Sequence, residues 1–565
     1  MIESEVSVSP RSWRGAFTRA FSVTGRSPNL LRAQLSFGAS FAGEWAFTVA
    51  LGVVAFEHGG ATAVGLVAFV RTAPAALIVP LGTALADRLR RDRVLLWSCI
   101  VRAVATAAAA LLLAADASMV AVYLLAVLAT AAFTVFRPAH SALLPILCLT
   151  PLELTSANLV RGLIDSLSTL LGPLAAALLL AVGSPAAVFA LAAALALCSA
   201  LLLLGLSYEG PPRPAPQPLR RIAAETVEGF RALKRYPSAG LVLALALSQT
   251  FTRGALNVFL VVVAIELLET GDPGVGLLTA AVGAGAVAGS LGAAMSVSGR
   301  RLAAVEGVGV ALWGLPLVLT GAFPYEPAVL GFMCVIGVGN ALVDVGAFTL
   351  PARLVPEELL ARVFGSFESL VALTVALGSL VTPLVIELVG LRGALVVLGL
   401  VAPTAVLLAW RRLQAIDASI ARRDEEIEVL KRVGMLRPLP MPAIENLAMH
   451  VGRSELGAGE EVFRQGDDGD SFYVIKQGEA EVIGDGREVR TMGPGDGFGE
   501  IALMHATRRT ATVRARTPLV LYTLERCHFV PAVAGYASSS REVDAIIVDR
   551  LGRFSPGPGG EHGPG

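Results

Sequence analysis

The segment Phe498–Thr512 brings together residue types that suit one small anionic ligand. Glu500 can accept a hydrogen bond from a sugar hydroxyl, and a glycine before it lets the backbone approach an anion closely. Ile501–Leu503 begins a short apolar helix whose free N–H groups can face a phosphate. Arg509 adds a forked cation for the same phosphate. The predicted ligand contacts are Gly499, Glu500, Ile501, Ala502, Arg508, Arg509 and Thr510.

This segment resembles the phosphate-binding cassette of cyclic nucleotide-binding domains, as in cyclic-nucleotide-gated channels, cyclic-nucleotide-dependent kinases and the catabolite-activator family. The resemblance implies that Glu500 holds the ribose 2′-hydroxyl and that Arg509 holds the cyclic phosphate. The family usually has Pro before its Arg, where Arg508 stands here, and we expect this change to tune affinity. Thr510 occurs in both cAMP- and cGMP-responsive relatives, so the regulatory ligand is cAMP or cGMP, with cAMP favoured.

Residues 437–553 are predicted to form the soluble domain that positions this cassette. Leu439–Val451 is predicted to be a short helix, and alternating apolar runs predict strands at 459–463, 471–475, 478–482 and 519–522. The pattern resembles the β-roll of the same family, and the resemblance implies a lid helix at 538–551. The Gly/Pro-rich tail, 554–565, is predicted to be disordered. A degenerate roll that binds nothing is the alternative, but such domains typically lose the Glu or the Arg, and both are present.

A membrane pattern precedes this domain. The chain is 55% hydrophobic and 16% charged, whereas a soluble domain is about 25% charged. Repeated apolar runs of ~20 residues predict a polytopic α-helical membrane protein with twelve transmembrane helices in two six-helix halves, 30–209 and 239–411. The predicted spans are 33–56, 62–86, 94–114, 118–147, 153–181, 185–207, 239–267, 273–297, 303–321, 327–351, 358–388 and 391–411.

Arg and Lys residues gather in alternate loops and set the predicted orientation. They are concentrated at 88–93, in the central loop 210–238 and after residue 410, which places these loops and both termini in the cytoplasm. We therefore expect a multi-pass protein of the cell membrane whose nucleotide site lies where cyclic nucleotides are made. The N-terminal arm, 1–29, is either a basic amphipathic helix on the inner leaflet or a disordered segment.

The membrane part resembles the major facilitator superfamily. The loop Gly82–Arg93 matches the family signature at Asp87, Arg88 and Arg91, although its first glycine is displaced. Short segments around Phe136–Pro145 and Thr349–Gly365 are most similar to the drug-exporter branch. The resemblance implies the major facilitator fold and a gate in which Asp87 caps the cytoplasmic N-terminus of helix 11, near Pro356–Glu358.

Several charged residues lie inside the apolar runs. Such residues are costly in a bilayer and usually pair or line a wet cavity. Glu44 and Arg253 occupy equivalent positions in the two halves, and we expect either that they form a breakable ion pair or that Glu44 carries the coupled proton. A purely structural pair is the alternative. The transport or coupling candidates are Glu44, Arg253, Asp165, Asp344 and Glu368.

The connector 412–436 has apolar residues at helical spacing and is predicted to be an amphipathic cytoplasmic helix. Two partners are open for its apolar face. It forms either a short coiled-coil seam in a homodimer, in which the nucleotide-binding domains can also take part, or a contact with its own transporter.

These features predict a secondary active transporter, proton-coupled, that exports amphipathic small molecules or lipids and is allosterically regulated by cyclic nucleotide. The alternative is a membrane-anchored cyclic nucleotide receptor whose membrane part no longer transports and signals to a protein partner. No enzyme is expected, because neither a Walker phosphate loop nor a nucleophile–base arrangement is present. Five scattered cysteines and zero net charge predict no metal, no cofactor and no nucleic-acid partner.

The gate interpretation predicts that Asp87→Asn weakens transport and leaves folding intact, because the cap loses its charge but keeps its shape. Flux in proteoliposomes, compared with the amount of monodisperse purified protein, measures both effects. Unaltered transport in this variant would refute the gate role of Asp87.

Overall fold

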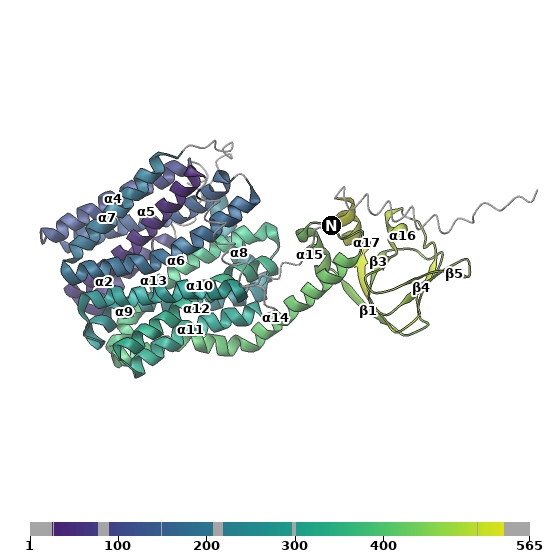
Figure 1. Ribbon diagram of the computed structural model, residues 1–565. Coiled ribbons are helices and arrows are strands. Elements are labelled where there is room, and N and C mark those ends of the chain that lie inside the picture. Colours follow the sequence, from purple (N-terminus) through teal and green to yellow (C-terminus); the bar gives the residue numbers. More distant parts are fainter. Residues whose placement is uncertain are drawn as a thin grey trace, which may run out of the picture. The chain divides into compact units, whose positions relative to one another are not determined.

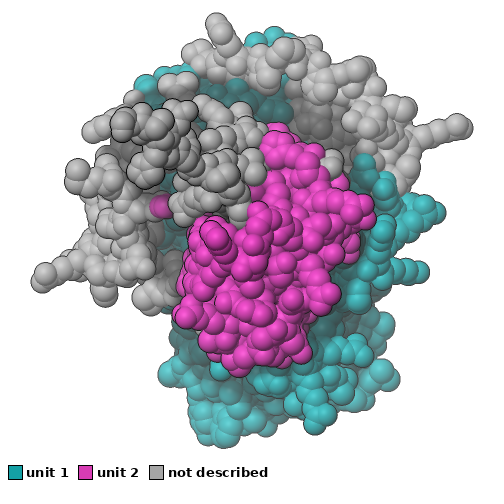
Figure 2. Space-filling model, turned by 90° about the vertical axis from the view of Figure 1, so that its right-hand side faces the viewer, with its two compact units in different colours: residues 1–416 teal, residues 417–565 magenta. Residues whose placement is uncertain are grey.

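A computed structural model describes residues 25, 27–76, 90–148, 150–206, 219–296, 301–505 and 507–535. These residues belong to two compact units, Met1–Ile416 and Asp417–Gly565, which Figure 2 shows in different colours. Several predictions fall outside the described residues. They concern the N-terminal arm before residue 25, Asp87 and Arg88 of the signature loop, the lid helix and the C-terminal tail.

The first unit is helical (Figure 1). In the described residues, ten helices are long and apolar enough to cross a membrane. Apolar segments of this length favour helices, because the core of a bilayer has no water to hydrogen-bond with the backbone. In a helix, the N–H and C=O groups bond to one another instead. The elements are α2 (Pro28–Thr72), α4 (Arg91–Ala114), α5 (Met119–Leu147), α6 (Pro151–Val182), α7 (Pro185–Leu204), α8 (Leu219–Arg235), α9 (Pro237–Val262), the π-helical η1 (Val263–Leu267), α10 (Gly271–Ser296), α11 (Leu302–Ala322), α12 (Glu326–Leu354), α13 (Glu357–Gly399) and α14 (Val401–Arg432).

Two of the long helices contain a break at a glycine. Gly60 in α2 has φ 58°, and Gly390 in α13 has φ 74°. A positive φ is strained for other residues, so glycine is suited to both places. Each break coincides with a loop that the sequence predicts between two spans. The count of twelve spans stays a prediction.

The two predicted halves meet through reciprocal helix pairs. α6 packs on α10, and α2 packs on α13. In the predicted numbering, the first pair joins span five to span eight, and the second joins span two to span eleven. A two-fold axis that relates the halves would exchange one pair for the other. Glycines allow the close approach, since a side chain at Gly283 would meet the backbone of Thr169, and one at Gly65 would meet Pro383.

The central loop contains a helix that the sequence prediction missed. α8 packs on α13, where Glu228 forms an ion pair with Arg362 at 2.7 Å. A side chain at Gly229 would meet the backbone of Arg362, so the two helices are in close contact. The polar composition of 219–235 hid this helix from a search for apolar spans.

The second unit is a β-roll of two antiparallel sheets. One sheet has the order β1-β8-β3-β6 and the other β2-β7-β4-β5. The expected helix and four strands are present, and β1, β5, β6 and β7 were not predicted. The elements are α15 (Met441–Met449), β1 (Gly452–Leu456), β2 (Glu461–Phe463), β3 (Ser471–Gln477), β4 (Ala480–Gly484), β5 (Arg487–Met492), β6 (Gly497–Phe498), α16 (Glu500–Met504), β7 (Thr512–Ala515), β8 (Leu519–Glu525) and α17 (Arg526–Ala534).

The connector is not a separate helix, because α14 runs without interruption from Val401 to Arg432. Near its end, Ile427 and Leu430 are buried in the core of the roll, in a cluster that includes Phe472 and Phe529. The predicted contact with the transporter is present at the start of the connector, where Leu413 lies against Gly307 of α11, but neither predicted partner covers the surface near its end. The apolar face of 427–436 is covered by the soluble domain of the same chain and leaves no coiled-coil seam there.

Packing between α9 and α13 predicts the effect of Gly254→Val. A side chain at Gly254 would meet the backbone of Val375, and overpacking of this kind typically costs about 1–3 kcal/mol or more. We expect Gly254→Val to lower the melting temperature of the purified protein in detergent. Size-exclusion chromatography after heating to a series of temperatures measures the folded fraction. Gly331→Val on α12 is the control, because nothing lies within 4 Å of the added carbon. Equal melting of the two variants would contradict this packing.

Candidate functional site

The predicted cassette folds around one turn and one short helix. β6 pairs with β3 and ends at Phe498, and the φ of 95° at the next residue, Gly499, permits the turn into α16. Glu500 is the first residue of α16, and it is only 1% exposed. A side chain at Gly499 would meet the Arg509 guanidinium at 2.7 Å, so this position needs glycine for space as well as for backbone conformation.

Arg509 is buried beside Glu500, at 4% exposure. Its Nη1 donates to the carbonyl of Gly499 at 3.0 Å, and its Nη2 donates to the carbonyl of Ser471 at 2.8 Å. The guanidinium lies over the Phe463 ring, 4.1 Å from the centroid. Its Nε is buried and has no hydrogen-bond partner in the described part of the chain.

Burial lowers the pKa of the Arg509 guanidinium from its usual value, and the nearby acidic groups, among them Glu500, oppose that shift. An arginine remains charged even so. The site therefore holds a desolvated cation that, within the described part of the chain, donates two of its five N–H groups to backbone carbonyls, which favours an anionic ligand.

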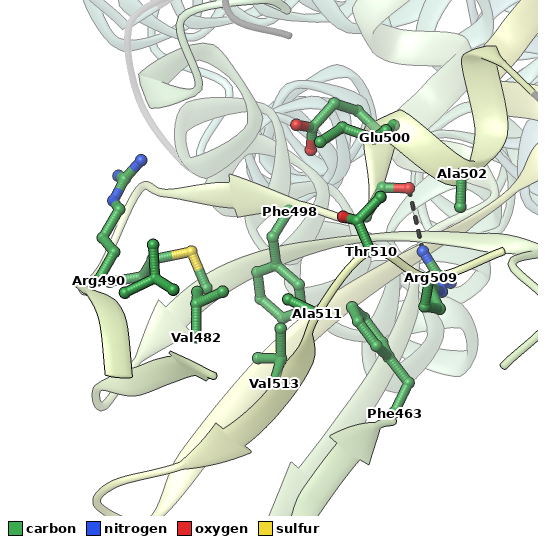
Figure 3. Close-up of a pocket in the computed structure, with 14 residues that line it drawn as sticks. Phe463, Val482, Arg490, Phe498, Glu500, Ala502, Arg509, Thr510, Ala511 and Val513 are labelled. Atoms are coloured by element: carbon green, nitrogen blue, oxygen red, sulfur yellow. Dashed lines mark hydrogen bonds between the residues drawn. The ribbon is translucent and has the colours of Figure 1, made fainter. Parts of the chain in front are cut away.

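A cavity that is open to solvent lies beside these residues. Figure 3 shows Glu500 and Thr510 on one side of it and the apolar side chains of Phe498 and Val513 on the other. The polar side suits a sugar and a phosphate, and the apolar side suits a flat ring. The lining residues are Phe463, Val482, Val489, Arg490, Met492, Phe498, Gly499, Glu500, Ile501, Ala502, Arg509, Thr510, Ala511 and Val513.

The structure brings together six of the seven predicted contacts, and Arg508 is the exception. Its side chain is 76% exposed, lies 3.9 Å from Asp468, and donates to the carbonyl of Gly466. The sequence prediction missed the apolar side of the cavity and Arg490, which pairs with Asp496 at 3.0 Å. Val482 and Met492 lie in β4 and β5, and the alternating pattern of β4 was the only signal that pointed to them.

In the helical unit, the predicted pair of Glu44 with Arg253 is wrong. The Glu44 carboxylate lies 3.1 Å from Arg102 on α4 and 3.6 Å from Arg71 at the end of α2. Arg102 is 2% exposed and also donates to the hydroxyl of Ser40. Equivalent positions in a repeat share a depth in the bilayer, but the rotation of each helix decides which neighbour a side chain meets.

The other transport candidates do come together. We call Arg137, Asp165, Arg253, Asp344 and Glu368 the central charged cluster. Arg137 pairs with Asp165 at 3.1 Å, and Asn340 donates to Asp344 at 3.0 Å. Both arginines attract all three carboxylates, so the cluster joins α5 and α6 of the first half to α9, α12 and α13 of the second. All its members except the half-buried Asp165 are exposed to solvent, although they lie within apolar helices.

Of the signature residues, the structure describes Arg91 alone. Its Nη1 donates to the carbonyl of Ala142 at 2.9 Å, which ties the start of α4 to α5. α13 begins at Glu357, after Pro356, as the predicted gate requires. The capping role of Asp87 stays a prediction, because Asp87 lies outside the described residues.

Comparison with known protein families matches residues 35–373 to the model of the Major Facilitator Superfamily. The chain belongs to the major facilitator superfamily. A second model, the cyclic nucleotide-binding domain, matches residues 453–535. This member of the superfamily therefore carries a cyclic nucleotide-binding domain after its transporter domain, and the two matches agree with the helical unit and the β-roll.

Individual relatives match smaller parts of this major facilitator protein. A cAMP-dependent protein kinase regulatory subunit of Yarrowia lipolytica is 41% identical over 87 residues, which are 15% of this chain and 23% of that protein. An uncharacterised protein of Mycobacterium tuberculosis is 37% identical over 136 residues, 24% of this chain and 25% of that protein. The chain thus spans a quarter or less of the length of these relatives.

Among solved structures, the regulatory domain of Toxoplasma gondii PKA in a co-crystal with cAMP is 26% identical, with a TM-score of 0.21. The match covers 24% of this chain and 55% of the Toxoplasma gondii chain. A second solved structure, PfPKA-R bound to cAMP, is 23% identical with a TM-score of 0.21, and the match covers 24% of this chain and 50% of that one.

The paired charges of the helical unit predict that Glu44→Ala destabilises the protein. Removing one partner of a buried ion pair leaves the other charge uncompensated and typically costs about 3–5 kcal/mol. The melting temperature in detergent measures the loss. Glu387→Ala is the control, because Glu387 is exposed and accepts a single hydrogen bond from Thr62. A melting temperature no lower than that of the control would show that Arg102 finds another partner.

Proposed function

We propose that this protein is a secondary active transporter whose activity is regulated by a cyclic nucleotide bound in the β-roll. The observation that carries the proposal is the buried pair Glu500 and Arg509 at a cavity with an apolar side, on the same chain as a major facilitator domain. In this proposal the phosphate of the nucleotide accepts a hydrogen bond from Arg509, and the ribose hydroxyl donates one to Glu500. The base contacts the apolar side of the cavity.

The ligand we favour is cAMP. The Yarrowia lipolytica relative is a regulatory subunit of a cAMP-dependent protein kinase, and it is 41% identical over the matched 87 residues. The lining of the base side is apolar at Val482, Met492 and Val513, which suits a purine that makes few polar contacts. cGMP is the competing ligand in every binding experiment proposed for this site.

Transport is supported by the central charged cluster. Ionisable groups inside membrane helices are costly and mark paths for substrates or ions. Because the cluster connects the two halves electrostatically, rearrangement of its pairs can accompany the movement of one half against the other. An aromatic group lies beside it, since the Arg137 guanidinium is 5.8 Å from the centroid of Phe41. Charge next to aromatic surface suits an amphipathic substrate with a charged group.

Export of that substrate, coupled to protons, completes the proposal. The preference for export rests on the resemblance to the drug-exporter branch, and the use of a gradient rests on the lack of a recognisable ATP motif in the sequence. We further propose twelve spans with both termini in the cytoplasm of a cell-membrane protein. The glycine breaks at Gly60 and Gly390 support the count by dividing two long helices where loops are predicted.

Regulation is proposed to act through α14. In the helical unit, Trp410 and Leu413 of α14 pack around Gly307 of α11. In the soluble unit, Leu430 is part of a core with Phe472 and Phe529 of the roll. Since the helix is continuous between these residues, a shift of its end on nucleotide binding reaches the transporter without a flexible linker. Allosteric couplings of this kind are typically about 1–3 kcal/mol.

The proposal predicts that Arg509→Ala abolishes nucleotide binding and its effect on transport, while basal transport remains. The anion loses its only buried guanidinium, so we expect binding to weaken at least about a hundredfold, which corresponds to ~2.7 kcal/mol. Calorimetry with cAMP and cGMP measures binding to the purified chain, and efflux of ethidium from proteoliposomes measures transport.

Arg508→Ala is the matched control, because Arg508 is exposed and does not line the cavity. Full binding by Arg509→Ala would refute the site. Nucleotide binding by a wild-type protein that moves neither dye nor protons would instead favour the alternative, a membrane-anchored receptor that signals to a partner.

A further inference from the structure

One carboxyl group in the helical unit has no place in the site or in the central charged cluster. Glu306, in the first part of α11, has an exposed fraction of 0%. Neither of its carboxyl oxygens has a hydrogen-bond partner in the part of the chain that the structure describes. A polar group in this situation requires an explanation, because buried polar groups are nearly always hydrogen-bonded.

The neighbouring helix makes room for this side chain. Gly346 of α12 lies against Glu306, so that a carbon added at Gly346 would be 2.5 Å from the Cβ and 3.0 Å from Oε2 of Glu306. Any larger residue at position 346 would displace the carboxyl group. Because Gly346 has no side chain, Glu306 can lie directly against the backbone of α12.

Charged groups on the surrounding helices have other partners or face elsewhere. α11 packs on α9, α12 and α13, and also touches α14 at Gly307. Arg253 of α9 and Asp344 of α12 belong to the central charged cluster, and Arg362 of α13 pairs with Glu228. On α14, Arg411 and Arg412 are exposed to solvent, and Asp417 has a partner of its own. Among the described residues, neither carboxyl oxygen of Glu306 therefore has a polar partner on these helices.

The other buried carboxylate of this unit shows the contrast. Glu44 is held by the guanidinium groups of Arg71 and Arg102, which stabilise its ionised form. Glu306 has no such cation. An ionised carboxylate without a partner in an apolar interior is strongly disfavoured, and the group takes up a proton instead.

We propose that Glu306 is a proton-binding site of the transporter. It carries a proton while α11 is packed on α12, and it releases that proton to water when the two helices part during the transport cycle. The inference rests on the proposed transport function and names the residue that binds the coupled proton. Its position is suited to regulation, because the next residue, Gly307, packs against Trp410 and Leu413 of α14.

The first test asks whether the proton is present. Infrared spectroscopy of the purified full-length protein in detergent detects the carbonyl stretch of protonated carboxyl groups. We expect Glu306→Gln to remove such a band, and Glu326→Gln, at an exposed position on α12, to leave it unchanged. An unchanged spectrum in Glu306→Gln overturns the proposal.

The second test asks whether the proton is used. In proteoliposomes with trapped pyranine, an ethidium gradient should drive proton movement in the wild-type protein and in Glu326→Gln. We expect at least a tenfold loss in Glu306→Gln, with ethidium exchange in the absence of a pH gradient retained. Loss of the infrared band without loss of proton movement overturns the coupling role.

The two proposals fail in different ways. If the wild-type protein moves no dye, the proposed transport function fails, while the infrared result still decides whether Glu306 binds a proton. Glu306→Met guards against a folding defect that is specific to glutamine. Since a site that holds a neutral group should accept neutral residues of similar length, unfolding of both variants overturns the proposal.

Discussion

The guanidinium of Arg509 is nearly excluded from water, and two backbone carbonyls and the Phe463 ring hold it in place. Desolvating a cation is costly, so a fold that does so must supply compensating contacts. Here the contacts come from segments far apart in the chain, namely Ser471 of β3 and Gly499 before α16. One charged side chain therefore connects these separate segments of the roll.

The same constraint organises the helical unit. The Glu44 carboxylate pairs with both Arg71 and Arg102 within the first half, where these contacts hold α2 against α4. The central charged cluster also places charged side chains within apolar helices. It combines arginines and carboxylates from both halves, and most of these side chains are exposed. A buried pair of the first kind stabilises a packing arrangement, whereas a hydrated network of the second kind can exchange partners. That difference separates the residues that hold the bundle from those suited to transport.

The continuous helix α14 contributes residues to the packing of both units. Its first part contributes to the packing around α11, and its last part belongs to the core of the roll. A helix transmits displacement better than a flexible linker, because its backbone hydrogen bonds hold its residues at fixed spacing. The segment between the major facilitator domain and the cyclic nucleotide-binding domain is thus helical from Val401 to Arg432.

The sequence alone determined the apolar helices, the strands with clear alternation and the cassette around Glu500 and Arg509, since each is written in local spacing and residue type. It did not reveal α8, whose polar composition lacks that signal, or the apolar side of the cavity, which is assembled from separate strands. Only the tertiary structure decided that Glu44 meets Arg102 instead of Arg253, that Arg508 points away from the cavity, and that Glu306 has no hydrogen-bond partner among the described residues. The physical reason is common to all three. Sequence spacing sets the depth of a residue along its own helix or strand, but its partner depends on how that element is rotated and on which distant segments pack against it.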